Sequence, residues 1–180
     1  MELLSSAPVV FSPLKGLWVP HSDRLVVVGA YPDGKGAFSV RKVDQDLRIQ
    51  PLRDVEKASG FRCAAMGVQP SVLRQVVTGQ YNGQVSLWDL DHLQSPVWSG
   101  KHSQLVNSVH CGDSKSSTRP EILSSCRDGT VNLWDTRVAD RPVMLLRSSS
   151  RSSDCWVAKF GTFFIRKEDN RLRQRTELSW

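Results

Sequence analysis

The sequence predicts an all-β protein assembled from repeated antiparallel units. Two segments, 75–90 (QVVTGQYNGQVSLWDL) and 121–136 (EILSSCRDGTVNLWDT), align without a gap and place their Trp-Asp pairs 46 residues apart. Self-similarity at a fixed period is the signature of repeat architectures. Each copy has an apolar run, an Asn-Gly or Asp-Gly turn and an alternating apolar/polar run, which is the pattern of a β-hairpin.

Weaker copies flank these two segments. Residues 14–20 and 24–43 give an apolar strand, a glycine-rich turn and a further strand, without a Trp-Asp pair. A later copy begins at 153–161 (SDCWVAKFG) and is not continued, because no turn glycine or Trp-Asp pair follows it. The expected organisation is an extension, three units and the start of a fourth: 1–13, then about 14–53, 54–98 and 99–146, then 153–161.

The last residues differ from the repeats in composition. Residues 165–177 (IRKEDNRLRQRTE) are charged, lack β-branched alternation and contain several good helix formers. Such a segment buries too little apolar surface to offset its ordering entropy. We therefore expect 162–180 to be a disordered or loosely helical basic tail, and we hypothesise that the chain is a truncated form of a longer protein.

Composition and charge exclude several classes of function. With 39% hydrophobic and 23% charged residues among 180, the chain has ordinary globular composition. It has no apolar run of about 18 residues and no secretory signal at its start, so neither a membrane partner nor secretion is expected. Of the net charge of +6, residues 147–180 contribute eight Lys/Arg against four acids. The rest is nearly neutral, and nucleic-acid binding is not expected.

No two of the four cysteines lie close together in the sequence. They are scattered, without a CxxC pair that could hold two thiolates on one metal. Without a signal peptide, free thiols in a reducing compartment are the expectation. The residues are Cys63, Cys111, Cys126 and Cys155.

The Leu-Trp-Asp and turn pairs are those of the WD-repeat family, which the chain resembles over about 14–161. The resemblance implies an all-β WD-repeat β-propeller, incomplete here, because members usually close a ring of about seven blades and this chain has about three and the start of a fourth. A narrower resemblance is to family members implicated in axonemal dynein assembly. Its residues are WVP at 18–20, TG-x-x-x-G-x-x-x-x-W at 78–88, SCRDGTVNLWD-x-R at 125–137 and DCW at 154–156.

The resemblance also implies a structural hydrogen-bond network in the third unit. It joins a histidine before the first strand, a Ser/Thr four residues before the turn Asp, that Asp, and a Trp six residues after it. Here these are His102, Ser124, Asp128 and Trp134. The second unit keeps Thr78 and Trp88 but has Asn82 for the Asp and no His, so we expect a weaker network there.

Other readings of polar residues point to chemistry that the spacing does not favour. Ser124, His102 and Asp128 have the residue types of a hydrolase triad, but their spacing fits the structural network. Gly29–Gly36 resembles a phosphate-binding loop, yet Gly36 stands where a hydroxyl must bind magnesium. The group His102, His110, Cys111 and Asp113 matches no common metal spacing. No catalytic residue, metal or cofactor is expected.

Protein binding is therefore the expected function. The resemblance places partner-binding residues just before the turn Asp (Tyr81, Arg127) and just before the inner strand (Arg62, Leu105, Trp156). Its narrower form implies a cytoplasmic adaptor that works with a prefoldin/RuvB-like co-chaperone complex in dynein-arm preassembly.

An alternative function rests on Trp134–Arg137. This segment matches the WD-x-R box through which some family members bind the adaptor of cullin-4 ubiquitin ligases, with Arg137 as its independent feature. By another reading Arg137 pairs with a neighbouring acid. The Ser/Arg run at 147–154 is interpreted as a flexible linker, with phosphorylation as the alternative.

Overall fold

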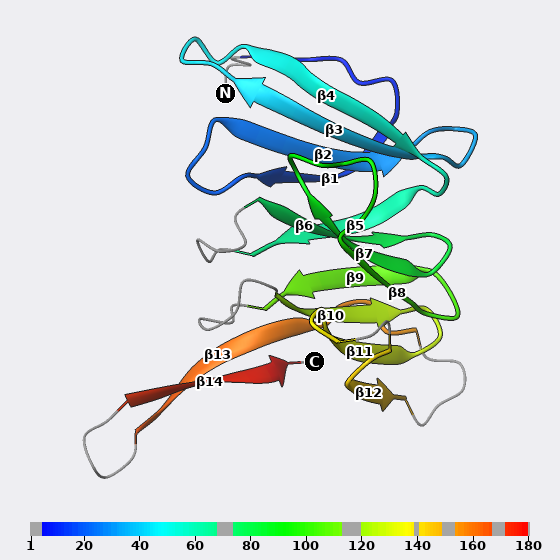
Figure 1. Ribbon diagram of the computed structural model, residues 1–180, viewed down its shortest axis with the longest axis vertical. Coiled ribbons are helices and arrows are strands. Elements are labelled where there is room, and N and C mark those ends of the chain that lie inside the picture. Colours follow the sequence, from blue (N-terminus) through cyan, green and yellow to red (C-terminus); the bar gives the residue numbers. More distant parts are fainter. Residues whose placement is uncertain are drawn as a thin grey trace.

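The computed structural model describes residues 5–67, 74–112, 120–138, 141–148, 154–166 and 172–179. Three four-stranded antiparallel sheets lie one after another along the long axis (Figure 1). Within those ranges the regular structure is β throughout, so the all-β fold class is confirmed. No helix in them is long and apolar enough to span a membrane.

Each sheet is formed by four consecutive strands in sequence order. The first sheet contains β1 (Ser12–Trp18), β2 (Arg24–Ala30), β3 (Gly36–Val43) and β4 (Ile49–Lys57). The second contains β5 (Phe61–Met66), β6 (Gln75–Gln80), β7 (Gln84–Asp89) and β8 (Trp98–Lys101). The third contains β9 (Val106–Cys111), β10 (Glu121–Cys126), β11 (Thr130–Asp135) and β12 (Met144–Arg147).

A two-stranded hairpin follows the third sheet. It joins β13 (Lys159–Arg166) to β14 (Leu172–Ser179), with a register from Lys159 opposite Ser179 to Arg166 opposite Leu172. For these residues the expectation of a disordered or helical tail is wrong. Antiparallel pairing satisfies backbone N–H and C=O groups whatever the side chains, whereas the prediction considered only side-chain burial. Residues 167–171, part of that prediction, lie outside the described ranges.

The same turn joins the second and third strands of each four-stranded sheet. Its glycine has a positive φ, 86° at Gly34, 87° at Gly83 and 77° at Gly129, which a residue without Cβ adopts freely. The Asp or Asn before each glycine accepts a hydrogen bond from a backbone N–H two residues after itself. The pairs are Asp33 and Lys35 (3.1 Å), Asn82 and Gln84 (3.0 Å), and Asp128 and Thr130 (3.0 Å).

Each turn glycine also ties its sheet to the segment that leads into the next one. The carbonyls of Gly34, Gly83 and Gly129 accept hydrogen bonds from the backbone N–H groups of Gly60, His102 and Ser148, at 2.9, 2.9 and 3.0 Å. The first sheet therefore contains the same turn as the other two, although it lacks their Trp-Asp pair.

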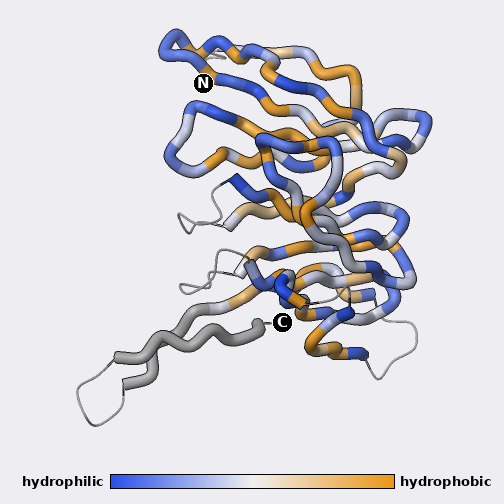
Figure 2. Tube along the Cα trace, viewed as in Figure 1, coloured by the Kyte–Doolittle hydropathy of each residue, from blue (hydrophilic) through white to orange (hydrophobic). Residues whose placement is uncertain are grey.

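Apolar side chains fill the spaces between successive sheets. Trp88 lies with its ring 6.2 Å from those of both Phe38 and Phe61, in a cluster shared by the first two sheets. Trp134 lies 5.5 Å from Trp98 in the cluster shared by the second and third. Hydrophobic stretches accordingly follow the strands, and hydrophilic stretches are common in the connecting loops (Figure 2). Each repeated tryptophan thus packs its sheet against the preceding one.

The first strands of the sheets run next to one another, β1 beside β5, β5 beside β9 and β9 beside β13. β1, β5 and β9 each contain a register irregularity near the start of the strand. A β-bulge leaves one residue outside the ladder and changes the direction of its side chain. The unpaired residues are Leu14, Arg62 and Asn107.

Candidate functional site

The third sheet holds a buried chain of hydrogen bonds among the residues of the predicted network. Trp134 Nε1 lies 2.7 Å from Ser124 Oγ, and the same hydroxyl lies 2.7 Å from His102 Nε2. The other ring nitrogen, His102 Nδ1, lies 3.1 Å from Thr130 Oγ1, which is bonded to the Asp128 carboxylate. Strands β10 and β11 supply Ser124, Thr130 and Trp134, the turn between them supplies Asp128, and the β8–β9 connection supplies His102.

The partners fix the direction of every proton in this chain. The Asp128 carboxylate only accepts, so the Thr130 hydroxyl donates to it and in turn accepts from His102 Nδ1–H. His102 Nε2 is then the acceptor for the Ser124 hydroxyl, whose oxygen accepts from the Trp134 indole N–H. His102 is therefore protonated at Nδ1, and burial disfavours a second proton at Nε2. The hydrogen-bond chain ends on a charged carboxylate, which strengthens it.

Burial and polar contacts shift the pKa values of the two ionisable groups in this hydrogen-bond chain, His102 and Asp128. Burial lowers the pKa of His102, and the nearby negative charge of Asp128 opposes that shift only in part. Burial acts to raise the pKa of Asp128, but hydrogen bonds from Ser103, Thr130 and Cys126 hold it at about 2. The neutral imidazole and the ionised carboxylate are thus the stable forms near neutral pH.

One detail of the expected network needs correction. The sequence placed Asp128 and His102 in one network without an intermediate residue, but the Asp128 carboxylate contacts Thr130 and Ser103, and Thr130 stands between Asp128 and His102. Sequence reasoning missed both hydroxyls. The available signal was the hydroxyl residue two positions after the turn Asp, because an Asx turn brings that residue back to the carboxylate.

The second sheet has a shorter version of this arrangement. Trp88 Nε1 donates to Thr78 Oγ1 at 2.8 Å, and Asn82 caps the N–H of Gln84 at the turn. The buried hydroxyl of Ser86, on the same sheet, has no hydrogen-bond partner among the described residues. The extended chain from tryptophan to carboxylate is thus found in the third sheet.

The arrangement provides no obvious reactive group. In a hydrolase triad the serine hydroxyl faces substrate, whereas Ser124 is fully buried and bonded to both Trp134 and His102. His102, Cys126 and Asp128 lie close enough to hold a metal ion. However, both imidazole nitrogens already have partners, and burial raises the pKa of the Cys126 thiol to about 11, so the thiolate ligand is disfavoured. The loop Gly29–Gly36 contributes the turn between β2 and β3.

The residues that the resemblance assigned to partner binding form two contacts, at the end of the sheets that carries the glycine turns. The Arg62 guanidinium lies over the Trp156 ring, 6.0 Å from its centroid. The backbone N–H of Arg127 donates to the Leu105 carbonyl at 3.1 Å, and the Arg127 side chain lies 3.9 Å from Asp154. Tyr81 is exposed on the turn of the second sheet. The structure therefore gathers Arg62 with Trp156 and Leu105 with Arg127.

Arg137 lies apart from these residues, just beyond the other end of β11. Its guanidinium makes two hydrogen bonds to the carboxylate of Asp135, at 2.8 and 2.6 Å. This is the pairing with a neighbouring acid, so the geometry adds no support for an adaptor contact.

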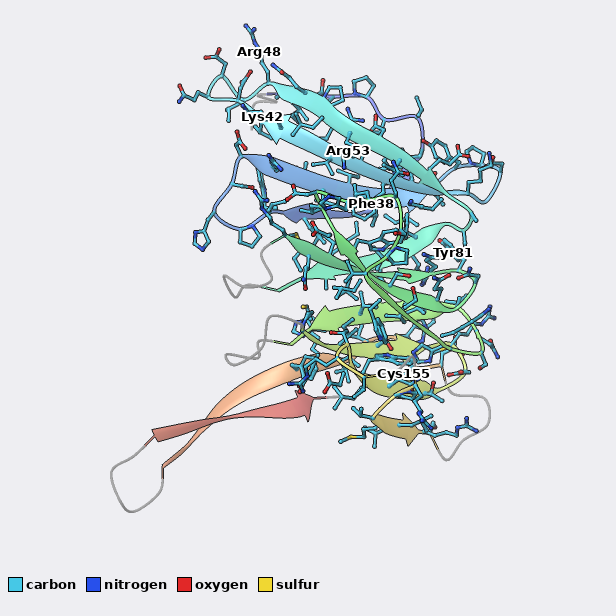
Figure 3. The ribbon with its side chains drawn as sticks, viewed as in Figure 1. Phe38, Lys42, Arg48, Arg53, Tyr81 and Cys155 are labelled. Atoms are coloured by element: carbon cyan, nitrogen blue, oxygen red, sulfur yellow. The ribbon has the colours of Figure 1, made fainter. Side chains whose placement is uncertain are left out.

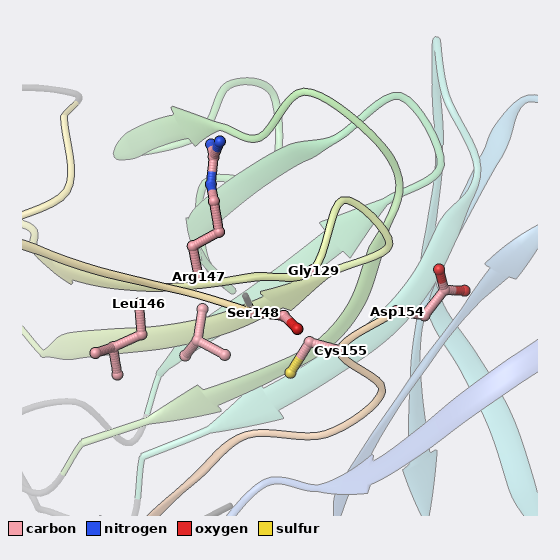
Figure 4. A pocket seen from close by; sticks show the side chains of 7 residues that line it. Gly129, Leu146, Arg147, Ser148, Asp154 and Cys155 are labelled. Carbon is pink, nitrogen blue, oxygen red and sulfur yellow. The ribbon is translucent and has the colours of Figure 1, made fainter. Parts of the chain in front are cut away.

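A pocket of about 500 Å³ opens beside the third sheet, on the side away from the second (Figure 4). Val131 and Leu146 form part of its wall, and Cys155 and Asp154 close it from the following segment. Burial raises the pKa of the Cys155 thiol, so the thiol is a poor nucleophile at neutral pH. Asp113 of the weighed metal group and most of the Ser/Arg run, 149–153, lie outside the described residues.

Fold and site together define an all-β protein of repeated four-stranded antiparallel sheets, whose central polar residues are engaged in hydrogen bonds that hold one sheet together. The chain is similar to dynein axonemal assembly factor 10 of several organisms. It is 31% identical to that of Chlamydomonas reinhardtii over 153 residues, which is 82% of this chain and 42% of the relative. For Homo sapiens the identity is 32% over 157 residues (84% and 43%), and for Xenopus tropicalis 30% over 166 residues (89% and 46%). The chain thus spans less than half the length of these relatives.

The comparisons do not support the expected membership of the WD-repeat family. No family model matches the chain. Nor do these relatives carry the name Monad, the WD-repeat protein whose motifs the narrower resemblance followed; the name they share is dynein axonemal assembly factor 10. A two-residue motif within a hairpin reports local strand and turn geometry, which explains why it indicated the sheets without establishing the family.

Proposed function

We propose that the chain is a non-catalytic, cytoplasmic protein-binding scaffold that acts in the assembly of axonemal dyneins. The observation that carries this proposal is the similarity to dynein axonemal assembly factor 10 over more than four fifths of the chain. More specifically, we propose an adaptor that works with a prefoldin/RuvB-like co-chaperone complex. The architecture of this scaffold is an incomplete β-propeller of about three blades and the start of a fourth.

Two structural features support a scaffold. The Ser124, His102 and Asp128 side chains that could carry chemistry belong to one hydrogen-bond chain of the third sheet, in which Thr130 links His102 to Asp128. In contrast, the exposed large side chains include Tyr81 and Trp156, residue types that dominate the energetics of protein interfaces. The cullin-4 reading rests on Arg137, whose guanidinium is hydrogen-bonded to Asp135, and no other contact among the described residues favours it.

Affinity purification of the tagged chain from ciliated cells, compared with its Arg137→Ala variant, tests the proposal. We expect prefoldin and RuvB-like subunits to co-purify with both forms, and depletion of the protein to reduce the dynein arms of the axoneme. Recovery of a cullin-4 adaptor that disappears with Arg137→Ala, or normal dynein arms after depletion, contradicts the proposal.

A further inference from the structure

The first strands of the three four-stranded sheets carry positive but no negative side chains. β1, β5 and β9 (SPLKGLW, FRCAAM and VNSVHC) contain Lys15 and Arg62 but no Asp or Glu. These strands lie next to one another, so no carboxylate of their own offsets the two cations. By comparison, the cations of β3 and β4 are mixed with acids, as in the ion pair of Arg41 on β3 with Asp54 on β4.

Arg62 is held in place with part of its guanidinium unused. As the bulge residue of β5, it reaches the third sheet, where its Nε–H donates to Asn107 Oδ1 at 3.2 Å. Asn107, the bulge residue of β9, is itself fixed because its Nδ2 donates to the Cys155 carbonyl at 2.9 Å. Neither terminal nitrogen of Arg62 has a hydrogen-bond partner among the described residues. A guanidinium with free terminal N–H groups in a fixed position is suited to a carboxylate.

Trp156 supplies an apolar surface at the same place. Its side chain is 61% exposed although the Arg62 guanidinium lies over its ring, and the adjacent Val157 is also exposed. A large exposed aromatic ring next to a cation can bury an apolar side chain while the cation binds the neighbouring charge. Because Arg62 and Trp156 already touch, little side-chain entropy remains to be lost on binding.

Lys15 extends the positive surface onto the first sheet. It is exposed and has no ion-pair partner in the part of the chain that the structure describes. Its strand, β1, lies beside β5, the strand that carries Arg62. The carboxylate of Asp154 is paired with Arg127, and among the described residues neither Lys15 nor Arg62 forms an ion pair.

We propose that Lys15, Arg62 and Trp156, which we call the inner-strand row, bind an acidic peptide segment of a partner protein. One carboxylate of the segment pairs with the Arg62 guanidinium, and an adjacent apolar side chain lies on Trp156. The inference rests on the proposed scaffold function and specifies the chemistry of its partner. A peptide is favoured over nucleic acid because phosphate backbones require several clustered cations, whereas this row offers two beside one indole.

Fluorescence anisotropy with synthetic decapeptides tests the proposal. The probe is a labelled peptide of Glu with two Leu residues, and the control is the same peptide with Gln in place of Glu. The complete chain is compared with Arg62→Gln, Lys15→Gln and Trp156→Ala. The matched control is Arg48→Gln, which removes the same charge from the first sheet at a position far from Cys155 (Figure 3).

We expect the acidic peptide to bind more tightly than the Gln peptide, with affinity that decreases as salt increases. Arg62→Gln weakens binding about tenfold or more, since it removes a charge-assisted hydrogen-bonded pair. Trp156→Ala also weakens it, and Arg48→Gln has no effect. Lys15 is exposed, so Lys15→Gln leaves the fold intact and keeps the test decisive if Arg62→Gln unfolds.

Equal binding of the Glu and Gln peptides, or equal losses for Arg48→Gln and Lys15→Gln, overturns the proposal. A labelled single-stranded oligonucleotide that binds more tightly than the acidic peptide also overturns it, in favour of a general polyanion surface. If the acidic peptide does not bind but chaperone subunits still co-purify with the chain, the inner-strand row is refuted and the scaffold function is retained. Peptide binding without those subunits leaves the row standing and removes the scaffold function.

Discussion

Removal of one buried hydroxyl should separate a bonded serine from an unbonded one. Ser124 and Ser86 are both fully buried in strands, but Ser124 Oγ is bonded to Trp134 and His102, whereas Ser86 Oγ has no partner among the described residues. Ser124→Ala leaves an indole N–H donor and an imidazole acceptor buried without partners. Each such group costs about 1–3 kcal/mol, and partial relaxation brings the expected total loss to about 2–4 kcal/mol.

Ser86→Ala is the matched control, because it removes the same atom from an equally buried strand position. Its expected effect is no more than about 0.5 kcal/mol, or a small gain, since burial of an unbonded hydroxyl is itself unfavourable. Urea unfolding followed by tryptophan fluorescence measures both, with the slope checked for constancy. A double-mutant cycle of Ser124→Ala with Trp134→Phe then isolates the coupling between the two side chains. Equal losses for the two serine variants refute the hydrogen-bond chain as a stabilising element.

Four further perturbations follow from the geometry. Because the folded pKa of Asp128 is about 2, below its ordinary 3.8, its carboxylate stabilises the protein above pH 3.8 and this stability is lost as pH falls toward 2. After allowance for solvent exposure the effect is about 1 kcal/mol, and a pH series of unfolding midpoints should lose this step with Asp128→Asn. The lowered pKa of His102 predicts a separate loss as pH falls below 6.5, absent in His102→Gln. Gly100→Ala places a Cβ 2.7 Å from ring atoms of both Trp98 and Trp134, and thermal unfolding should show a cost of about 1–3 kcal/mol. Arg137→Ala removes an exposed ion pair with Asp135, so the unfolding midpoint of the variant should equal that of the wild type. A clear decrease would contradict the view that this ion pair contributes little to stability.

The repeated hairpins could be predicted from the sequence because their determinants are local. Gly83 and Gly129 adopt the positive φ that these hairpin turns require. Alternation of apolar and polar residues in 84–89 and 130–135 defines the strand that follows each turn. The same reasoning placed Ser124 and Trp134 on adjacent strands, where the structure finds them bonded. The tail was predicted incorrectly because pairing between β13 and β14 depends on a backbone partner, which side-chain composition does not reveal.

The sequence by itself determined the all-β class and the turn positions, because each depends on neighbours within one hairpin. Only the tertiary structure decided that Thr130 stands between His102 and Asp128, that Trp134 packs on Trp98 of the preceding sheet, and that Arg62 meets Trp156. These contacts join residues that lie on different sheets, or on a sheet and a segment outside it. They depend on the way sheets stack and on bulges that change the direction of single side chains, and neither is encoded in a local periodicity.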